Sequence, residues 1–205
     1  GKGVPLSPSM FLEQKQKVSI SHGGVLPHWH TQGVIQFVTF RLADSLPQSR
    51  LAELNLMKDQ WLAKHPQPWT SDDAAVYGEM FISRINRWLD AGYGQCILEK
   101  PEIRQIVIDS LHHFDGIRYA LFDYVVMPNH VHMLILPYIG LDEIMHTIKS
   151  YTAKIINRRL GRQGTVWQHE SFDHLIRSNK EFREKRDYIL HNPDALPGKK
   201  LTAEL

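Results

Sequence analysis

The sequence predicts an α+β fold in which helices pack on one face of an antiparallel sheet. Three observations predict it. A β-branched and aromatic run comes early, two further strand-like runs flank a short turn near the middle, and amphipathic helical segments lie between and after them. The resulting order is strand, helices, hairpin, helix, extended segment and helix.

The first half supplies one strand and two helices. Residues 1–32 look irregular, and Gly33–Leu42 reads as a strand. Leu51–His65 reads as a helix, and a second helix runs from Ser71, which can cap it, to about Ala91, where a glycine follows. Apolar residues recur along this second helix at helical spacing and predict a stripe that faces the core: Tyr77, Phe81, Ile85 and Trp88.

The second half supplies the hairpin and the remaining helices. Pro101 suits the first turn of a helix. Ile117–Pro137 reads as a hairpin, and Leu141–Gly161 as an amphipathic helix. The stretch 165–178 is predicted to be extended, and 179–192 to be a helix that the following proline stops.

Composition narrows the class of protein. The 205 residues suit one domain, spanning 1–205, with a helical elaboration at about 51–100. Cys96 is the only cysteine, which excludes an intramolecular disulfide and favours a reducing compartment. No apolar run reaches the roughly 20 residues of a membrane helix. We therefore expect a soluble cytoplasmic protein that makes no membrane contact.

Positive charge is concentrated towards the end of the chain. The net charge is only +2, but basic residues outnumber acidic ones after His146. This bias is compatible with a polyanionic partner, although charges on a helix often serve only solvation. The basic residues best placed to contact such a partner lie on one predicted helix: Lys149, Lys154, Arg158 and Arg159.

Two histidines interrupt the apolar stretch "VVMPNHVHMLILP" at 125–137. Because side chains alternate along a strand, His130 and His132 should project from one face while the residues between and after them enter the core. Neighbouring imidazoles on a rigid strand suit a divalent metal that has a third ligand. Taken alone, the pattern fits two histidines on a solvated face better than it fits a metal site.

A second pattern of the same form, His28-Trp29-His30, lies between a proline and a glycine before the first strand. We expect it to form a loop or turn at the surface. In that place Trp29 is available to stack on a base of a nucleic acid, and the flanking histidines are available as further contacts.

An oxygen ligand and a reactive group are both present in "DYILHNP". Tyr188 and Asn192 are four residues apart and share a helix face, with Asn192 at the helix end because a proline follows. The amide oxygen can bind a hard cation, and the phenol lies one turn away. Tyr151 is a rival tyrosine, but no oxygen ligand stands four residues after it. Packing alone also explains a tyrosine at this spacing.

The hairpin motif, "IKSYTAKIIN" and "VWQHESFDHLIRSNKEFREKRDYILHNP" together resemble the single-tyrosine His-hydrophobe-His (HUH) transposases. The similarity is greater to the branch associated with repetitive extragenic palindromes (REP). It runs from about Leu26 to Pro193 and is least diagnostic over Leu51–Lys100. The resemblance implies a ferredoxin-like (RRM-like) antiparallel sheet, with a helical insertion after the first strand.

The same resemblance implies a site and an activity. His130, His132 and Asn192 would hold Mg²⁺ or Mn²⁺, and Tyr188 would be the nucleophile. Members of the family cleave single-stranded DNA beside hairpins and join the tyrosine to the 5′ phosphate, as monomers or homodimers. A tyrosine with a pKa near ~10 is protonated at neutral pH and needs help as a nucleophile. The metal would give that help by polarising the phosphate, which is the electrophile.

Two other functions fit the same scaffold. One is a catalytically silent module that binds hairpin DNA or RNA, and the other is an HUH replication initiator or relaxase. The presence of Tyr188 with both histidines and Asn192 favours the enzyme, because a binding module needs none of them. Initiators and relaxases usually carry further domains, for which this chain offers little room.

Overall fold

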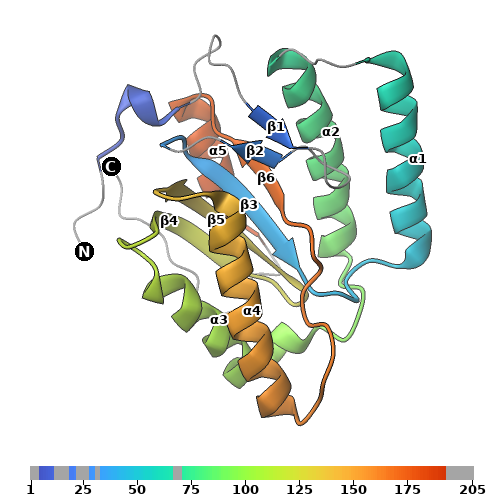
Figure 1. Cartoon of the computed structure of the whole chain (residues 1–205), viewed down its shortest axis with the longest axis vertical. Helices are drawn as coiled ribbons and strands as arrows, with labels where there is room; N and C mark the ends of the chain where they lie inside the picture. Colours follow the sequence, from blue (N-terminus) through green and yellow to red (C-terminus); the bar gives the residue numbers. More distant parts are fainter. Residues whose placement is uncertain (1–4, 12–18, 22–27, 31–32, 67–70, 193–205) are drawn as a thin grey trace.

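A computed structural model describes residues 5–11, 19–21, 28–30, 33–66 and 71–192 of the chain. Its centre is an antiparallel four-stranded sheet with the strand order β4-β5-β3-β6 (Figure 1). Strands β3 and β4 are rich in β-branched and aromatic residues, which favour strands. The bounds are β3 Gln36–Arg41, β4 Tyr119–Val126, β5 His130–Pro137 and β6 Phe172–Leu175.

The topology confirms the predicted α+β class. Helices separate β3 from β4 and β5 from β6, and the first and third of these strands lie side by side at the centre of the sheet. This is the ferredoxin-like arrangement. Helices α3 (Pro101–His113) and α4 (Leu141–Leu160) cover one face, where they pack on residues of all three long strands, including Val131 and Met133.

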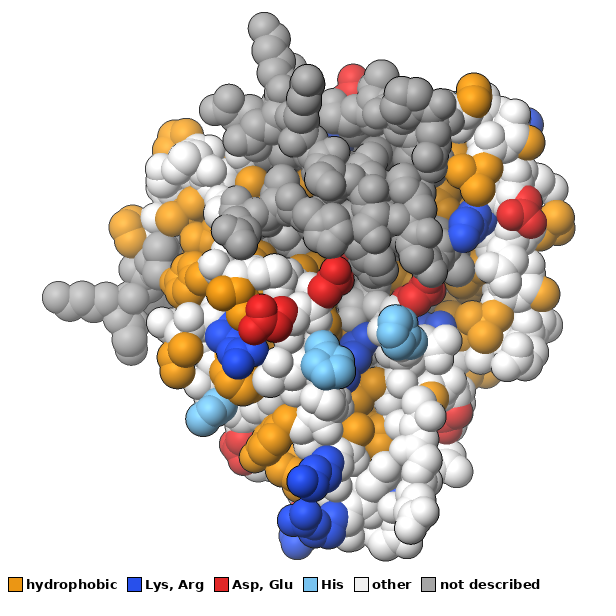
Figure 2. Space-filling model, in the orientation of Figure 1, with side chains coloured by type: hydrophobic (Ala, Val, Ile, Leu, Met, Phe, Trp, Pro, Cys, Tyr) orange, Lys and Arg blue, Asp and Glu red, His pale blue; other side chains and the backbone are white. Residues whose placement is uncertain are grey.

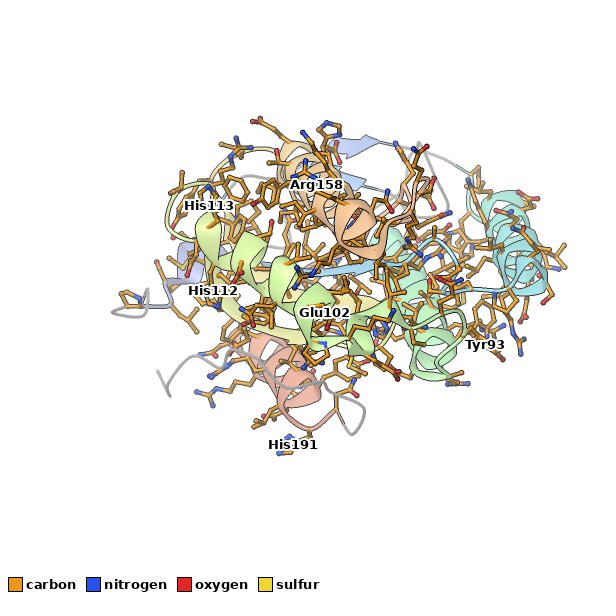
Figure 3. All side chains as sticks on the ribbon, turned by 90° about the horizontal axis from the view of Figure 1, so that it is seen from below. Tyr93, Glu102, His112, His113, Arg158 and His191 are labelled. Atoms are coloured by element: carbon orange, nitrogen blue, oxygen red, sulfur yellow. The ribbon has the colours of Figure 1, made fainter. Side chains whose placement is uncertain are left out.

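The opposite face is covered by α5 (Asn179–Leu190), which was not expected there. In Figure 3 the sheet lies between α4, marked by Arg158, and α5, whose end is marked by His191. The prediction of helices on one face therefore holds for α3 and α4. A second layer is required because β3, β4 and β5 are buried along their whole length, so their apolar residues face both sides.

An ion pair with a buried carboxylate anchors α5 to the sheet. Arg186 Nε lies 2.9 Å from Oδ2 of Asp123, a residue of β4 that no solvent reaches. The carboxylate stands next to an irregularity of the β4–β5 pairing, between Leu121 and Asp123. Removing one partner of such a pair leaves a buried charge unpaired, so the contact fixes where α5 lies.

Helices α1 (Gln48–Lys64) and α2 (Ser71–Asp90) form a layer of their own beside β6 (Figure 1). The apolar stripe predicted for α2 is confirmed as core: it packs on Leu54 of α1 and Phe172 of β6. Gly92 ends the segment with a positive φ of 70°, a conformation that glycine adopts without strain. Asp90, the last residue of α2, lies beside the central sheet, with its Oδ1 3.8 Å from Nε2 of His130 on β5.

The expectation that 28–30 forms a loop is wrong. His28–His30 is a strand, β2, which pairs antiparallel with β1 (Ser19–Ser21) and lies next to β6. Trp favours strands, and a proline or glycine nearby in the sequence does not exclude one. Two short 3₁₀ helices, Pro8–Met10 and Ile97–Glu99, complete the described elements. The side chains of 28–30 lie outside the description.

Among the helices that the structure describes, none combines the length and the hydropathy that crossing a membrane requires.

Candidate functional site

The two histidines stand at the start of β5 with their side chains on the face that α5 covers. Neither imidazole is accessible to solvent, which excludes a solvated pair. Val131, Met133 and Ile135 belong to the core on the opposite face, as strand alternation predicts. The ring nitrogens of the pair converge: Nε2 of His130 lies 2.9 Å from Nε2 of His132.

The turn before β5 fixes the protonation of His130. Asn129 donates from Nδ2 to the carbonyl oxygen of Tyr93 at 2.9 Å, which orients its amide. The amide oxygen then faces Nδ1 of His130 at 2.7 Å. An amide oxygen can only accept, so Nδ1 of His130 carries the proton and Nε2 presents a lone pair.

Thr39 completes the arrangement from the neighbouring strand. It stands opposite His132 in the β3–β5 register, and its hydroxyl lies 2.8 Å from Nδ1 of that histidine. A hydroxyl donates or accepts. Without an ion, Thr39 donates and the His132 proton lies between the two Nε2 atoms. With Thr39 as the acceptor, both Nε2 lone pairs are free for a cation.

Tyr188 projects from α5 towards this pair. Its hydroxyl lies 3.4 Å from Nε2 of His132, and the two rings meet edge to face. The ring also meets the edge of Phe37, which stacks on His132. Burial raises the pKa of the Tyr188 phenol above its ordinary value, and the charge of Asp90 adds to this effect. The phenol is therefore neutral at physiological pH.

Asp90 is the site residue that sequence reasoning missed. Its Oδ2 accepts from the Tyr188 hydroxyl at 3.5 Å, and its Oδ1 lies 3.8 Å from Nε2 of His130. One signal was available. A carboxylate in the last turn of a helix opposes the helix dipole, and such a local conflict often marks a functional position.

Asn192 lies beyond the end of α5, as the following proline requires. Its side chain is buried and hydrogen bonds with the Tyr188 hydroxyl, an interaction that lowers the phenol pKa against the larger opposing effects. The prediction that the side chains of Asn192 and Tyr188 lie close together therefore agrees with the structure. The structure adds Asp90 as a second oxygen donor there.

The donor set fits a divalent cation. One atom each from Asp90, His130 and His132 lies within 4.8 Å of the others. Burial lowers the pKa of His130 to about 3 and that of His132 well below its ordinary value, so both imidazoles are neutral. Neutral imidazoles and a carboxylate are ligands for first-row divalent metals. These three residues are the candidate metal centre.

A cleft of about 570 Å³ leads to the centre between α2 and α5. Asp90 and Tyr188 line its inner end together with Phe37. Charged residues of both signs line the rest: Glu79, Arg87, Glu181, Glu184 and Lys185.

The rival tyrosine is placed away from the centre. Tyr151 is exposed on α4, on the opposite side of the sheet from His132. Tyr124, the tyrosine of the preceding strand, is buried and bonds to His112 at 3.2 Å, so it belongs to the core. Trp167 and Phe172 are likewise buried in the core.

The basic residues predicted to follow DNA are all on α4. Lys149 donates to the carbonyl oxygens of Gln168 and His169, both at 2.9 Å, and burial lowers its pKa to about 7. Lys154, Arg158 and Arg159 are exposed. Figure 2 shows this face, with Lys and Arg side chains gathered towards the end of α4. It is not the face that carries Tyr188.

The buried histidines predict a dependence of stability on pH. An unfolded histidine is protonated below about pH 6.5, whereas the folded pair stays neutral, so the unfolded state binds more protons. The free energy of unfolding should fall as the pH drops below 6.5, by up to about 1.4 kcal/mol per pH unit for each histidine. Urea unfolding in a chelator at pH 7.5, 6.0 and 5.0 measures this slope.

The control replaces both imidazoles with groups that do not titrate. A His130→Gln/His132→Gln double variant should show a flatter slope between pH 6.5 and 5.0 than the unchanged chain. Equal slopes in the two proteins would mean that the histidines are charged in the folded state.

Fold and site together define a class. A ferredoxin-like sheet presents a His-Val-His pair to a tyrosine on the helix that covers the same face. Residues 98–192 match the family model described as "Transposase IS200 like". This part of the chain, 95 of the 205 residues, is therefore similar to IS200-like transposases.

Two further comparisons were made. No curated protein matches the chain. Among solved structures, one described as a REP-associated tyrosine transposase bound to a REP hairpin is 18% identical, and the alignment covers 81% of this chain and 70% of that one with a TM-score of 0.41.

Proposed function

We propose that the protein is a metal-dependent endonuclease and strand transferase that acts on single-stranded DNA beside a hairpin. The observation that carries the proposal is the Tyr188 hydroxyl, which lies 3.4 Å from Nε2 of His132 at the inner end of a cleft. A nucleophile, two neutral imidazoles and a carboxylate meet there. A module that only binds DNA has no use for this combination.

The reaction would exchange one phosphate ester for another. The Tyr188 oxygen attacks the scissile phosphorus, an O–P bond to tyrosine forms, and the bond to the 3′ oxygen breaks. The phenol loses its proton as it attacks, and the departing oxygen takes up a proton to become a 3′ hydroxyl. The 5′-phosphotyrosine keeps the bond energy, so the strand can be rejoined to another 3′ end in transposition or recombination.

The phenol needs help because its pKa is raised by burial. Asp90 accepts the hydrogen bond from the hydroxyl and holds it towards the cleft. Asn192 bonds to the same hydroxyl and limits the directions in which its lone pairs point. These two contacts orient the nucleophile before any phosphate arrives.

A bound Mg²⁺ or Mn²⁺ would supply a positive charge that polarises the phosphate. His130, His132 and Asp90 would hold the ion, and the amide of Asn192 is a further oxygen donor. The second nitrogen of each imidazole is already bonded, to Asn129 and Thr39, and such bonds orient metal ligands. The protein would meet its DNA in the cytoplasm, where the nucleoid lies.

Incubation with labelled hairpin oligonucleotides tests the function. Single strands with an unpaired flank, in Mn²⁺ or Mg²⁺, should yield a covalent adduct that survives denaturing gels and a free 3′ hydroxyl fragment. Chelation should remove both products. Tight hairpin binding with no adduct in either metal would favour a binding module on this scaffold.

The exposed basic residues of α4 give a separate prediction about affinity. We expect Arg158→Glu and Lys154→Glu to weaken hairpin binding by similar factors for many sequences, because phosphate contacts position DNA without reading it. Each change should also reduce the salt dependence of binding. The cleavage rate at saturating DNA should stay unchanged, since α4 lies across the sheet from Tyr188. Fluorescence anisotropy at several salt concentrations measures the effect, and salt-independent affinity would refute it.

A further inference from the structure

Lys185 occupies a particular place in the cleft. It stands three residues before Tyr188 on α5, so the two side chains share a helix face. Both line the cleft between α2 and α5. The Lys185 ammonium lies 5.3 Å from the centroid of the Phe37 ring, the same ring that stacks on His132. A cation is thereby held beside the reaction centre.

Two other cations of α5 form ion pairs with carboxylates. Arg186 pairs with buried Asp123, and Lys180 pairs with Glu184 at 3.8 Å on the exposed side of the helix. Within the described part of the chain, no carboxylate lies within ion-pair distance of Lys185. Its charge is therefore available to a ligand.

The Lys185 charge lies close to the centre. Its ammonium and the imidazole of His132 both contact the Phe37 ring, each at 5.3 Å from the ring centroid. A cation this close to metal-binding nitrogens repels the metal, so metal binding alone gives no reason for it. A phosphate next to the metal gives one, because it carries negative charge and gains more as the tyrosine attacks.

We propose that Lys185 is a catalytic residue that contacts a non-bridging oxygen of the scissile phosphate, from the side away from the metal centre. The inference rests on the proposed function and names how the same cleft recognises its substrate. Lys185 forms and breaks no bond. It neutralises charge on the phosphate, and its place one helical turn from Tyr188 sets the phosphate against the nucleophile.

The test asks whether the loss of binding caused by changing Lys185 depends on the charge of one particular phosphate. In full-length protein with Tyr188→Phe, which cannot cleave, Lys185→Gln should weaken hairpin binding roughly tenfold or more, as for loss of a charged hydrogen bond. The same change should cost almost nothing on DNA in which one linkage is a neutral methylphosphonate. Moving this linkage one nucleotide at a time identifies the phosphate in contact.

Three controls separate the contact from general effects. Arg183→Gln removes an exposed charge from the same helix outside the cleft and should leave both affinities unchanged. Lys185→Arg keeps the charge and should retain most of the binding. Lys185→Gln should bind Mn²⁺ at least as tightly as the unchanged chain, because a repelling charge has gone. With Tyr188 restored, Lys185→Gln should lower the single-turnover cleavage rate at saturating DNA by at least about tenfold.

The outcomes distinguish this inference from the function on which it rests. Equal losses on native and neutral linkages at every position would overturn the contact while leaving cleavage intact. Coupling at one linkage, in a chain that never forms an adduct, would keep the contact and overturn the endonuclease. A chain that binds no single-stranded hairpin would overturn both.

Discussion

Tyr188→Phe should abolish the covalent adduct and strand cleavage while leaving hairpin binding intact. The change removes one oxygen and keeps the ring, which would still meet Phe37 and His132 edge to face. The lost hydrogen bonds to Asp90 and Asn192 should cost about 1 kcal/mol of stability. Cleavage should vanish because phenylalanine cannot attack phosphorus. Denaturing gels with labelled DNA, and thermal unfolding, measure the two effects.

Tyr151→Phe is the matched control, since it removes the same atom from an exposed tyrosine across the sheet. It should form adduct at the unchanged rate. Mass spectrometry of a digested adduct should locate the nucleotide on the peptide that contains Tyr188. A nucleotide on Tyr151, or full cleavage by Tyr188→Phe, would refute the assignment of the nucleophile.

Metal binding should depend on Asp90 as strongly as on the histidines. His132→Gln removes one of two imidazole ligands, and Asp90→Asn removes the only charge of the donor set. We expect each to weaken Mn²⁺ binding by tenfold or more, in line with losses of about 10- to 100-fold for changes just outside a metal shell. Titration followed by the electron paramagnetic resonance of free Mn²⁺ measures this. Mg²⁺ should bind more weakly than Mn²⁺, because imidazole suits it less.

Glu79→Gln controls for charge in the cleft. Glu79 lines the same cleft and also lies on α2, but it is outside the donor set. Its replacement should leave Mn²⁺ affinity within about twofold, as expected for a single exposed charge. Equal losses for Asp90→Asn and Glu79→Gln would show that the cleft attracts cations by its overall charge, with no ligand role for Asp90.

Local sequence patterns predicted most of the fold because each depends on near neighbours. Period-two alternation placed His130 and His132 on one face, and four-residue spacing placed Asn192 at Tyr188. Such local patterns could not predict which face of the sheet α5 would cover. The strands are apolar on both faces, so their sequence does not say which helix covers which side.

Asp90 could not be predicted because its role is set by tertiary structure. Forty residues separate it from His130, and the packing of α2 against β6 places its side chain. The incorrect predictions for 28–30 and for Lys149 of α4 have the same cause, because tertiary contacts decide both. Lys149 looked available to DNA, yet two carbonyl oxygens far along the chain hold its ammonium.

Because neither imidazole reaches solvent, an ion can arrive only when something in front of the pair moves. The rings of Phe37 and Tyr188 stand there, and Tyr188 belongs to a helix held by the buried pair between Arg186 and Asp123. Loading and loss of metal should therefore be slow, at the pace of partial opening of that helix. Once loaded, the protein would keep its ion through many encounters with DNA, even where free metal is scarce.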